Sequence, residues 1–253
     1  MTLLRVEGLN KEFGGVHAIA GLTFAIESGT IHSIIGPNGA GKTTLFNLIT
    51  GIYVPTSGRI FFNDQEVTAH RSSELAARGM SRTFQNLQVF FNMTALENVM
   101  VGAHLHLNRG FFPALFGLKG IRRADKALRE EAADLMRFVG LDDFVGADAD
   151  AMPYGALKRL EIARALAARP KMLLLDEPAA GLNPTESREV DDVIRRVAEQ
   201  GITVVLVEHD MRMVMGISDH ILVLDYGRKL TEGTVDKVRN DPEVISAYLG
   251  GQA

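Results

Sequence analysis

The sequence of 253 residues contains no cysteine and only 8 prolines. Without cysteine the chain has no disulfide bond, no thiolate metal ligand and no thiol nucleophile, which is compatible with a reducing compartment. Hydrophobic residues make up 46% of the sequence and charged residues 23%, which is typical of a globular protein and not of a disordered or fibrous one. The length allows one large domain or two interlocked smaller ones.

Long apolar runs are also missing. No stretch reaches the roughly 18 to 20 apolar residues that a membrane-spanning helix needs, and the longest weakly charged region, 83–108, is interrupted by Glu97. The first ten residues lack a basic segment followed by an apolar run, so we expect no signal peptide and a cytoplasmic protein. The net charge of −4 argues against a general nucleic-acid binder.

Short apolar runs that end at glycine or acidic residues predict buried parallel strands. They occupy 31–35, 172–175, 202–207 and 221–224. Helical patterns lie between them, over 43–49, 157–168 and 184–199, each with a glycine or proline at its end. This alternation predicts an α/β fold with a mostly parallel sheet.

Two other regions have different patterns. The segments 3–9, 22–26 and 59–62 alternate more and predict a small antiparallel β layer. Between about 87 and 157 no buried strand is evident, and a set of apolar residues falls on one helical face before Gly140. The set is Ala124, Ala127, Leu128, Ala132, Leu135, Met136 and Val139. We therefore predict a helical insert between two halves of the core.

The strongest motif is a glycine-rich loop over 36–43, which reads G-P-N-G-A-G-K-T between a predicted strand and a predicted helix. It matches G-x-x-x-x-G-K-[ST], in which backbone N–H groups surround phosphate oxygens at the start of a helix. Lys42 is expected to reach the β and γ phosphates, and Thr43 to bind Mg²⁺. The alternative is a glycine-rich turn with an incidental lysine.

A pair of carboxylates ends the predicted strand at 172–175, at the edge where open α/β sheets bind ligands. Asp176 is expected to hold Mg²⁺, directly or through water. Glu177 is placed to polarise a water that attacks the γ phosphate. Without the glycine-rich loop, the same pair would be interpreted as an ordinary turn cap.

Three further elements follow in order: Gln85, the run Y-G-A-L-K-R-L-E-I-A-R-A-L over 154–166, and His209 after the predicted strand at 202–207. With them the sequence resembles the ATP-binding cassette (ABC) ATPases of membrane transporters over essentially its whole length. The segments 179–184, 208–210 and 247–250 look most like subunits that energise branched-chain amino acid uptake. Subfamilies for urea or amide uptake and for lipopolysaccharide export look similar here.

The resemblance implies a single nucleotide-binding domain over 1–253 with a RecA-like P-loop core. The core with its antiparallel layer would comprise about 1–84 and 165–253, and a helical signature subdomain about 85–164. It also implies two cofactors, ATP and Mg²⁺, and closure as a homodimer or heterodimer around two ATP molecules.

The resemblance also assigns roles to single residues. Gln85 would reach Mg²⁺ or the attacking water, although a solvated hinge amide fits as well. His209 would bond the γ phosphate and orient Glu177, whereas a lone histidine is otherwise more often structural. Phe13 would stack on adenine, or else belong to the core.

The predicted site falls into three groups. The expected catalytic residues are Lys42, Gln85, Glu177 and His209, and the expected Mg²⁺ ligands are Thr43, Gln85 and Asp176. The expected ATP-binding residues are Phe13, Gly36, Pro37, Asn38, Gly39, Ala40, Gly41, Lys42, Thr43 and Thr44.

The signature element departs from the Leu-Ser-Gly-Gly-Gln of the family, which contacts ATP held by the opposite subunit. Here it reads Met152, Pro153, Tyr154, Gly155 and Ala156. Pro153 removes a hydroxyl and a backbone N–H but can open the following helix. We therefore expect asymmetric catalysis with a different partner ATPase. Asn183, in place of the usual aspartate, is expected to cap the helix that begins at Pro184.

The resemblance implies integral-membrane permease subunits as partners, no nucleic acid, and a peripheral position on the cytoplasmic face of the inner or plasma membrane. Phe90, Phe91 and Met93 are candidate anchors for a permease helix and equally fit the core of the helical part. Rival functions are a soluble ABC protein, a P-loop kinase or GTPase, and a nonhydrolysing regulatory module. A soluble ABC protein commonly has paired cassettes, and a P-loop GTPase needs a guanine-reading motif; neither is evident in the sequence. A nonhydrolysing module would have lost Lys42, Asp176 or Glu177, and all three are present.

Overall fold

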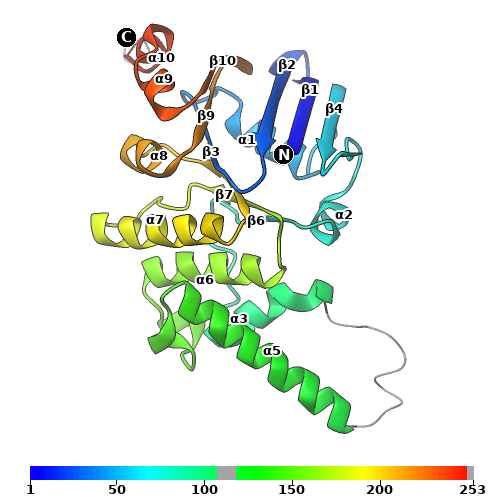
Figure 1. The fold of residues 1–253 in the computed structure, drawn as a ribbon, viewed down its shortest axis with the longest axis vertical. Helices are drawn as coiled ribbons and strands as arrows, with labels where there is room; N and C mark the ends of the chain where they lie inside the picture. Colours follow the sequence, from blue (N-terminus) through cyan, green and yellow to red (C-terminus); the bar gives the residue numbers. More distant parts are fainter. Residues whose placement is uncertain (107–117, 250–253) are drawn as a thin grey trace.

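A six-stranded sheet forms the centre of the fold in the computed structural model, which describes residues 1–106 and 118–249 (Figure 1). In spatial order its strands are β10 (Arg228–Gly233), β9 (His220–Asp225), β3 (Ile31–Ile35), β8 (Thr203–Val207), β7 (Met172–Asp176) and β6 (Met80–Arg82). All run parallel except β10, which pairs antiparallel with β9 at the edge. The strands predicted at 31–35, 172–175, 202–207 and 221–224 are confirmed.

The strands β3, β7 and β8 are buried at every residue, because helices or a second, antiparallel sheet cover both faces of the main sheet. Alternate side chains enter two different apolar clusters, as the pleat requires. Leu173 and Leu175 of β7 belong to the cluster that contains the long helix at 184–199. Leu174, between them, belongs to the cluster of the first helix and the second sheet.

The second sheet is antiparallel and lies to one side of the first (Figure 1). Its order is β2 (Val16–Glu27), β1 (Thr2–Phe13), β4 (Ser57–Phe62) and β5 (Gln65–Glu66). Its buried side chains, including Leu4, Ile60 and Phe62, share a cluster with Phe46 of α1 (Lys42–Ile49). The antiparallel layer predicted from 3–9, 22–26 and 59–62 is confirmed, and so is the α/β fold class.

The helical part lies below the main sheet in Figure 1. It contains α3 (Ala95–Gly102), η1 (Ala103–His106), α5 (Leu118–Phe138), η2 (Asp142–Phe144), η3 (Ala149–Ala151) and α6 (Tyr154–Ala167). Within the described residues of 87–157, the β pairing is a single bridge between Thr94 and Asp148. The apolar face predicted for α5 packs from Leu128 onward. Ala124 and Ala127 are exposed, because the first turns of α5 extend beyond α3 and α6 (Figure 1).

The remaining helices are α2 (Ser72–Ala77), α7 (Pro184–Glu199), α8 (Met211–Ile217), α9 (Val235–Arg239) and α10 (Pro242–Leu249). The helix predicted at 184–199 is confirmed, and α6 begins at Tyr154, ahead of the predicted start at Leu157. The sequence analysis did not predict β6 and β10, because β6 is short and β10 is polar.

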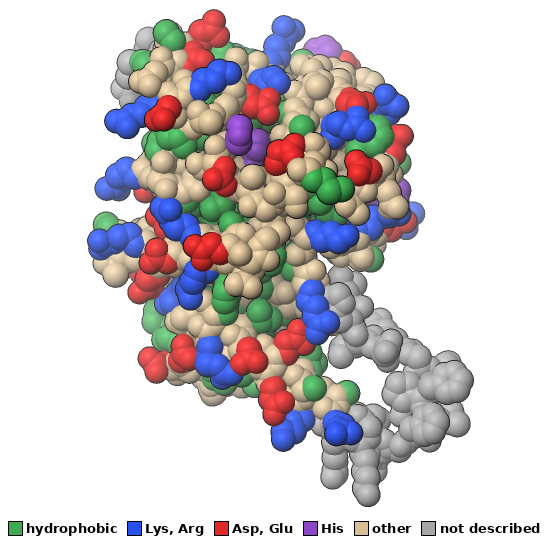
Figure 2. All heavy atoms as spheres, viewed as in Figure 1, with side chains coloured by type: hydrophobic (Ala, Val, Ile, Leu, Met, Phe, Trp, Pro, Cys, Tyr) green, Lys and Arg blue, Asp and Glu red, His purple; other side chains and the backbone are tan. Residues whose placement is uncertain are grey.

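Acidic and basic side chains are interspersed on the face shown in Figure 2. Among the described residues, no helix combines the length and the apolar character that a membrane span requires.

Candidate active site

The glycine-rich motif at 36–43, called the phosphate loop below after the prediction, begins directly after β3 and ends in the first turn of α1, as predicted. Two of its glycines are required by close approach as well as by backbone conformation. A Cβ on Gly36 (φ 152°) would lie 2.2 Å from the carbonyl oxygen of Leu224, and one on Gly41 (φ 98°) would lie 2.7 Å from that of Ala18. Any side chain at either position would therefore displace the loop from β9 or β2.

Lys42 is buried within the curve of this loop, at 7% exposure. Its Nζ donates to the carbonyl oxygens of Gly36, at 2.7 Å, and Pro37, at 2.9 Å. Burial lowers the pKa of Lys42, and the nearby Glu177 carboxylate acts in the opposite direction. The ammonium group is thus held by the loop that the motif predicts to bind phosphates.

Glu177 is held between two side chains from distant parts of the sequence. Gln85 Nε2 donates to Glu177 Oε2 at 2.9 Å, and His209 Nε2 lies 2.9 Å from Glu177 Oε1. Glu177 itself has φ 49°, a left-handed conformation that is uncommon for a residue other than glycine and is often found at functional sites. The structure thus brings together three of the four predicted catalytic residues.

These residues face the phosphate loop across a cavity of about 440 Å³. Its lining includes Asn38 to Thr44, Gln85, Glu177 and His209, together with Val16, His17, Ala18 and Tyr226. The last four were not predicted, since they lie on β2 and on the turn between β9 and β10 without a motif of their own.

Phe13 does not belong to that lining. It is exposed at the end of β1, and its ring meets Tyr53 edge to face with the centroids 5.3 Å apart. Stacking of Phe13 on adenine stays a prediction.

Asp176 forms a buried ion pair that the sequence did not predict. Arg82 Nη2, from β6, lies 2.7 Å from Asp176 Oδ2, and both side chains are less than 10% exposed. Arg82 Nη1 also donates to Asn47 Oδ1 at 2.7 Å and Thr50 Oγ1 at 3.1 Å. Because these contacts come from β6 and α1, Arg82 fixes the carboxylate against both elements.

Glu208 is a second unpredicted residue, at the end of β8 and only 4% exposed. Its Oε1 accepts from the backbone N–H of Ala179 at 2.8 Å, and its Oε2 from that of His209 at 2.9 Å. One carboxylate therefore joins the turn after Glu177 to the segment that carries His209.

The residues 152–156 lie at the start of α6, with Pro153 as the residue before its first turn. They do not line the cavity at the phosphate loop. A Cβ on Gly155 would lie 2.7 Å from the Glu186 carboxylate, so α7 packs closely against this position.

Asn183 caps α7 as predicted. Its Oδ1 accepts from the backbone N–H groups of Thr185, at 2.9 Å, and Glu186, at 3.0 Å. Glu186 in return accepts from the N–H of Asn183 at 3.0 Å, which completes a reciprocal capping box.

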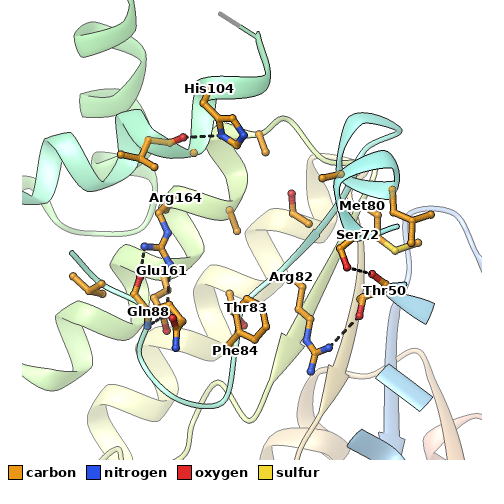
Figure 3. Close-up of a pocket in the computed structure, with 18 of the residues that line it drawn as sticks. Thr50, Ser72, Met80, Arg82, Thr83, Phe84, Gln88, His104, Glu161 and Arg164 are labelled. Carbon is orange, nitrogen blue, oxygen red and sulfur yellow. Dashed lines mark hydrogen bonds and ion pairs between the residues drawn. The ribbon is translucent and has the colours of Figure 1, made fainter. Parts of the chain in front are cut away.

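A second cavity, of about 540 Å³, lies between the main sheet and the helical part (Figure 3). Its lining includes Phe84, Val89, Phe90, Glu161 and Arg164. This cavity is called the groove below. Of the three predicted permease anchors, Phe90 lines the groove, whereas Phe91 and Met93 do not. Phe90 and Phe91 are 43% and 51% exposed, and Met93 is half-buried.

The described residues contain no group of three His, Cys, Asp or Glu side chains that could hold a metal ion by themselves. The predicted Mg²⁺ ligands are instead a hydroxyl, an amide and a carboxylate, of which Thr43 and Gln85 line the cavity at the phosphate loop. Oxygen donors of this kind suit Mg²⁺, which commonly takes one or two protein ligands in addition to substrate phosphates.

Comparison with known proteins supplies independent findings. Residues 19–180 match the family described as ABC transporter, and residues 228–253 match the family described as branched-chain amino acid ATP-binding cassette transporter. The high-affinity branched-chain amino acid transport ATP-binding protein BraF of Pseudomonas aeruginosa is 45% identical over 249 residues, which cover 98% of each chain.

The corresponding protein LivG of Escherichia coli is 43% identical over the same length and share. Among solved structures, the ADP conformation of an ATP-binding cassette of an ABC transporter superposes with a TM-score of 0.85 at 32% identity and covers 99% of both chains.

Proposed function

Because the chain belongs to the ABC transporter family of ATP-binding subunits, we propose that it hydrolyses ATP to drive branched-chain amino acid import through a membrane permease. The arrangement of Gln85, Glu177 and His209 opposite the phosphate loop carries the proposed chemistry. The full-length similarity to BraF and LivG supports the substrate class. Uptake of urea or amides, or export of lipopolysaccharide, is the alternative within the family.

In the proposed reaction a water molecule attacks the γ phosphorus in line with the leaving oxygen. Glu177 accepts a hydrogen bond from that water and orients or deprotonates it. Gln85 and His209 fix the Glu177 carboxylate from its two sides. Lys42 leaves the carbonyl oxygens of Gly36 and Pro37 for the phosphate oxygens and stabilises the charge that develops there.

Thr43 and Asp176 are proposed to hold Mg²⁺ with Gln85, and ATP is bound by the phosphate loop. When bound, Mg²⁺ neutralises charge on the phosphate oxygens. The ion pair with Arg82 keeps Asp176 in a fixed position at the end of β7, which lowers the conformational cost of binding the ion.

We place the second half of each ATP site on another subunit. The residues 152–156 lie outside the cavity of their own chain, as they should if they act on ATP held by a partner. Pro153 carries neither hydroxyl nor N–H, so the site to which this chain lends its signature should be the weaker one. A different ATPase with the usual serine would complete the site built on Lys42 and Glu177.

The groove of Figure 3 is the proposed docking site for a cytoplasmic helix of the permease. Its exposed Phe84 and Phe90 supply apolar surface suited to a helix, and Phe91 and Met93 would lie at its margin. Docking there would place the chain on the cytoplasmic face of the membrane. The helical part, about 85–164, would then move relative to the core at 1–84 and 165–253.

Transport in cells tests this function. Cells that lack the chain should lose uptake of radiolabelled leucine, isoleucine and valine, and wild-type chain should restore it. Lys42→Ala should not restore it, because the ammonium group contacts the phosphates. Restored uptake with Lys42→Ala would contradict the ATPase role. Unchanged leucine uptake together with a loss of urea or amide uptake would instead favour the alternative.

A further inference from the structure

Helix α6, which begins at the signature residues, holds the backbone of the segment 85–88 through three charged side chains. Lys158 Nζ donates to the carbonyl oxygen of Gln85 at 3.3 Å. Glu161 Oε1 accepts from the N–H of Gln88 at 2.6 Å, and Arg164 Nη1 donates to the carbonyl oxygen of Gln88. Figure 3 shows Glu161 and Arg164 side by side and directed at Gln88.

The three side chains recur every third residue, so they form one stripe on α6. Lys158 and Glu161 are 4% and 3% exposed, and burial raises the pKa of Glu161. A buried charge is costly unless it is well paired. Lys158 and Arg164 are the counter-charges of Glu161, and all three side chains also bond the backbone of 85–88, so this charged cluster is arranged around that segment.

The signature end of this stripe contacts a third element. Lys158 Nζ lies 5.8 Å from the centre of the Tyr154 ring, and a Cβ on Gly181 would lie 3.3 Å from the same ring. Tyr154 stands where the family usually has glycine, so its ring adds a contact between the signature and the turn after Glu177.

The other end of the stripe reaches the groove. Arg164 lies over the Phe90 ring, 5.6 Å from its centre, and also 3.7 Å from Glu161. Phe90, Glu161, Arg164 and Gln88 all line the groove. A continuous series of contacts therefore runs from Phe90 through α6 and the segment 85–88 to Gln85, which bonds Glu177.

We propose that Lys158, Glu161 and Arg164 are positioning residues that hold the segment 85–88 so that Gln85 meets Glu177. Tyr154 extends these contacts to the signature residues. This role rests on the proposed ATPase function, because it acts through Gln85 and Glu177.

A double-mutant cycle on the purified full-length chain tests the positioning role. Glu161→Ala and Lys158→Met should each lower kcat about tenfold, the loss expected for one hydrogen bond to a charged group, with KM for ATP unchanged. In a Gln85→Ala background neither substitution should lower kcat further, because the residue that they position is gone. Glu161→Gln keeps one acceptor for the Gln88 N–H and should retain most activity. Effects that add to that of Gln85→Ala would overturn the role.

A second measurement needs no turnover and guards against a folding defect. The chain has no tryptophan, so Phe84→Trp places a single reporter in the groove, at the residue that directly precedes Gln85. Addition of Mg·ATP should shift its emission, and Lys158→Met should abolish the shift while nucleotide still binds. The exposed Lys126 of α5 supplies the matched control, Lys126→Met, which should leave the shift unchanged.

The two measurements separate failure of the positioning role from failure of the proposed ATPase function. An equal shift with and without Lys158 would overturn the positioning role alone. A reporter protein that binds no ATP although α6 is intact would count against the proposed function itself.

Discussion

Arg82 and Asp176 form a buried ion pair across two neighbouring parallel strands, with Arg82 Nη2 2.7 Å from Asp176 Oδ2. The pair connects the strand that leads to Gln85 with the strand that leads to Glu177. Phe46 and Phe84 flank the guanidinium at 5.4 and 5.3 Å from their ring centres. Loss of either side chain would leave the other buried without its partner.

Removal of one partner should therefore destabilise the fold strongly. Arg82→Met should lower the free energy of unfolding by about 3–5 kcal/mol, because it leaves Asp176 buried without a counter-charge. Urea denaturation followed by circular dichroism measures the change. Arg59→Met, which breaks an exposed pair with Glu7, is the matched control and should cost at most about 1 kcal/mol.

The double variant Arg82→Met, Asp176→Leu separates stability from activity. Replacement of a buried ion pair by apolar side chains is often neutral or stabilising, so much of the lost stability should return. The double variant should have no ATPase activity, because the Asp176 carboxylate is missing. A double variant as unstable as Arg82→Met alone would show that the pair itself is not the source of the loss.

Glu177→Gln should abolish ATP hydrolysis without loss of ATP binding, because the amide cannot accept a proton from the attacking water. ATP would then persist at the interface and hold two subunits together. Gel filtration with Mg·ATP should show a dimer for Glu177→Gln, and a phosphate-release assay should show no turnover. Turnover close to that of the wild type would remove Glu177 from its assigned role.

Pro153→Ser should raise the ATPase rate of the isolated chain, since serine restores a hydroxyl and a backbone N–H at the signature. Each such contact to a charged phosphate is worth roughly a factor of 10 to 100. Rates should be measured over a series of protein concentrations, with Lys42→Ala as the inactive control. Fast wild-type turnover that Pro153→Ser leaves unchanged would contradict the asymmetric arrangement, because Tyr154 and Gly155 would then be sufficient to complete the ATP site.

Local patterns explain which features the sequence could predict. The phosphate loop, the strand at 172–176 and the capping box at Asn183 depend on residues close together in sequence, so their motifs were sufficient. Glu177 was assigned from its position after a buried strand, and Gln85 and His209 were assigned to the same site through family resemblance. The structure places both within hydrogen-bonding distance of Glu177.

Arg82 and Glu208 were missed for a physical reason. Their partners, Asp176 and Ala179, lie 94 and 29 residues away in the sequence, and only the sheet order makes them neighbours. A charged residue in or directly after a buried strand was the available signal, because such a charge requires a partner. The contacts of α6 with Gln88 were invisible for the same reason.

His32 gives the fold a predictable sensitivity to acid. Its ring is buried in β3, Nε2 has no hydrogen-bond partner among the described residues, and the ring stacks on that of His220 at 6.1 Å. Burial, with a smaller contribution from His220, lowers the pKa of His32 from 6.5 to about 4. The folded state therefore keeps this ring neutral at pH values where the unfolded chain protonates it.

The sign of the effect follows from proton binding. Between pH 6.5 and 4 the unfolded chain binds more protons at His32 than the folded chain, so stability falls as the pH falls through this window. The full loss is about 3 kcal/mol, and above pH 6.5 the contribution is complete. His32→Gln should flatten this part of a urea-denaturation profile, whereas His17→Gln, at a 62% exposed side chain, should leave it as in the wild type. Equal slopes for His32→Gln and wild type would mean that other groups, such as the carboxylates, control acid unfolding.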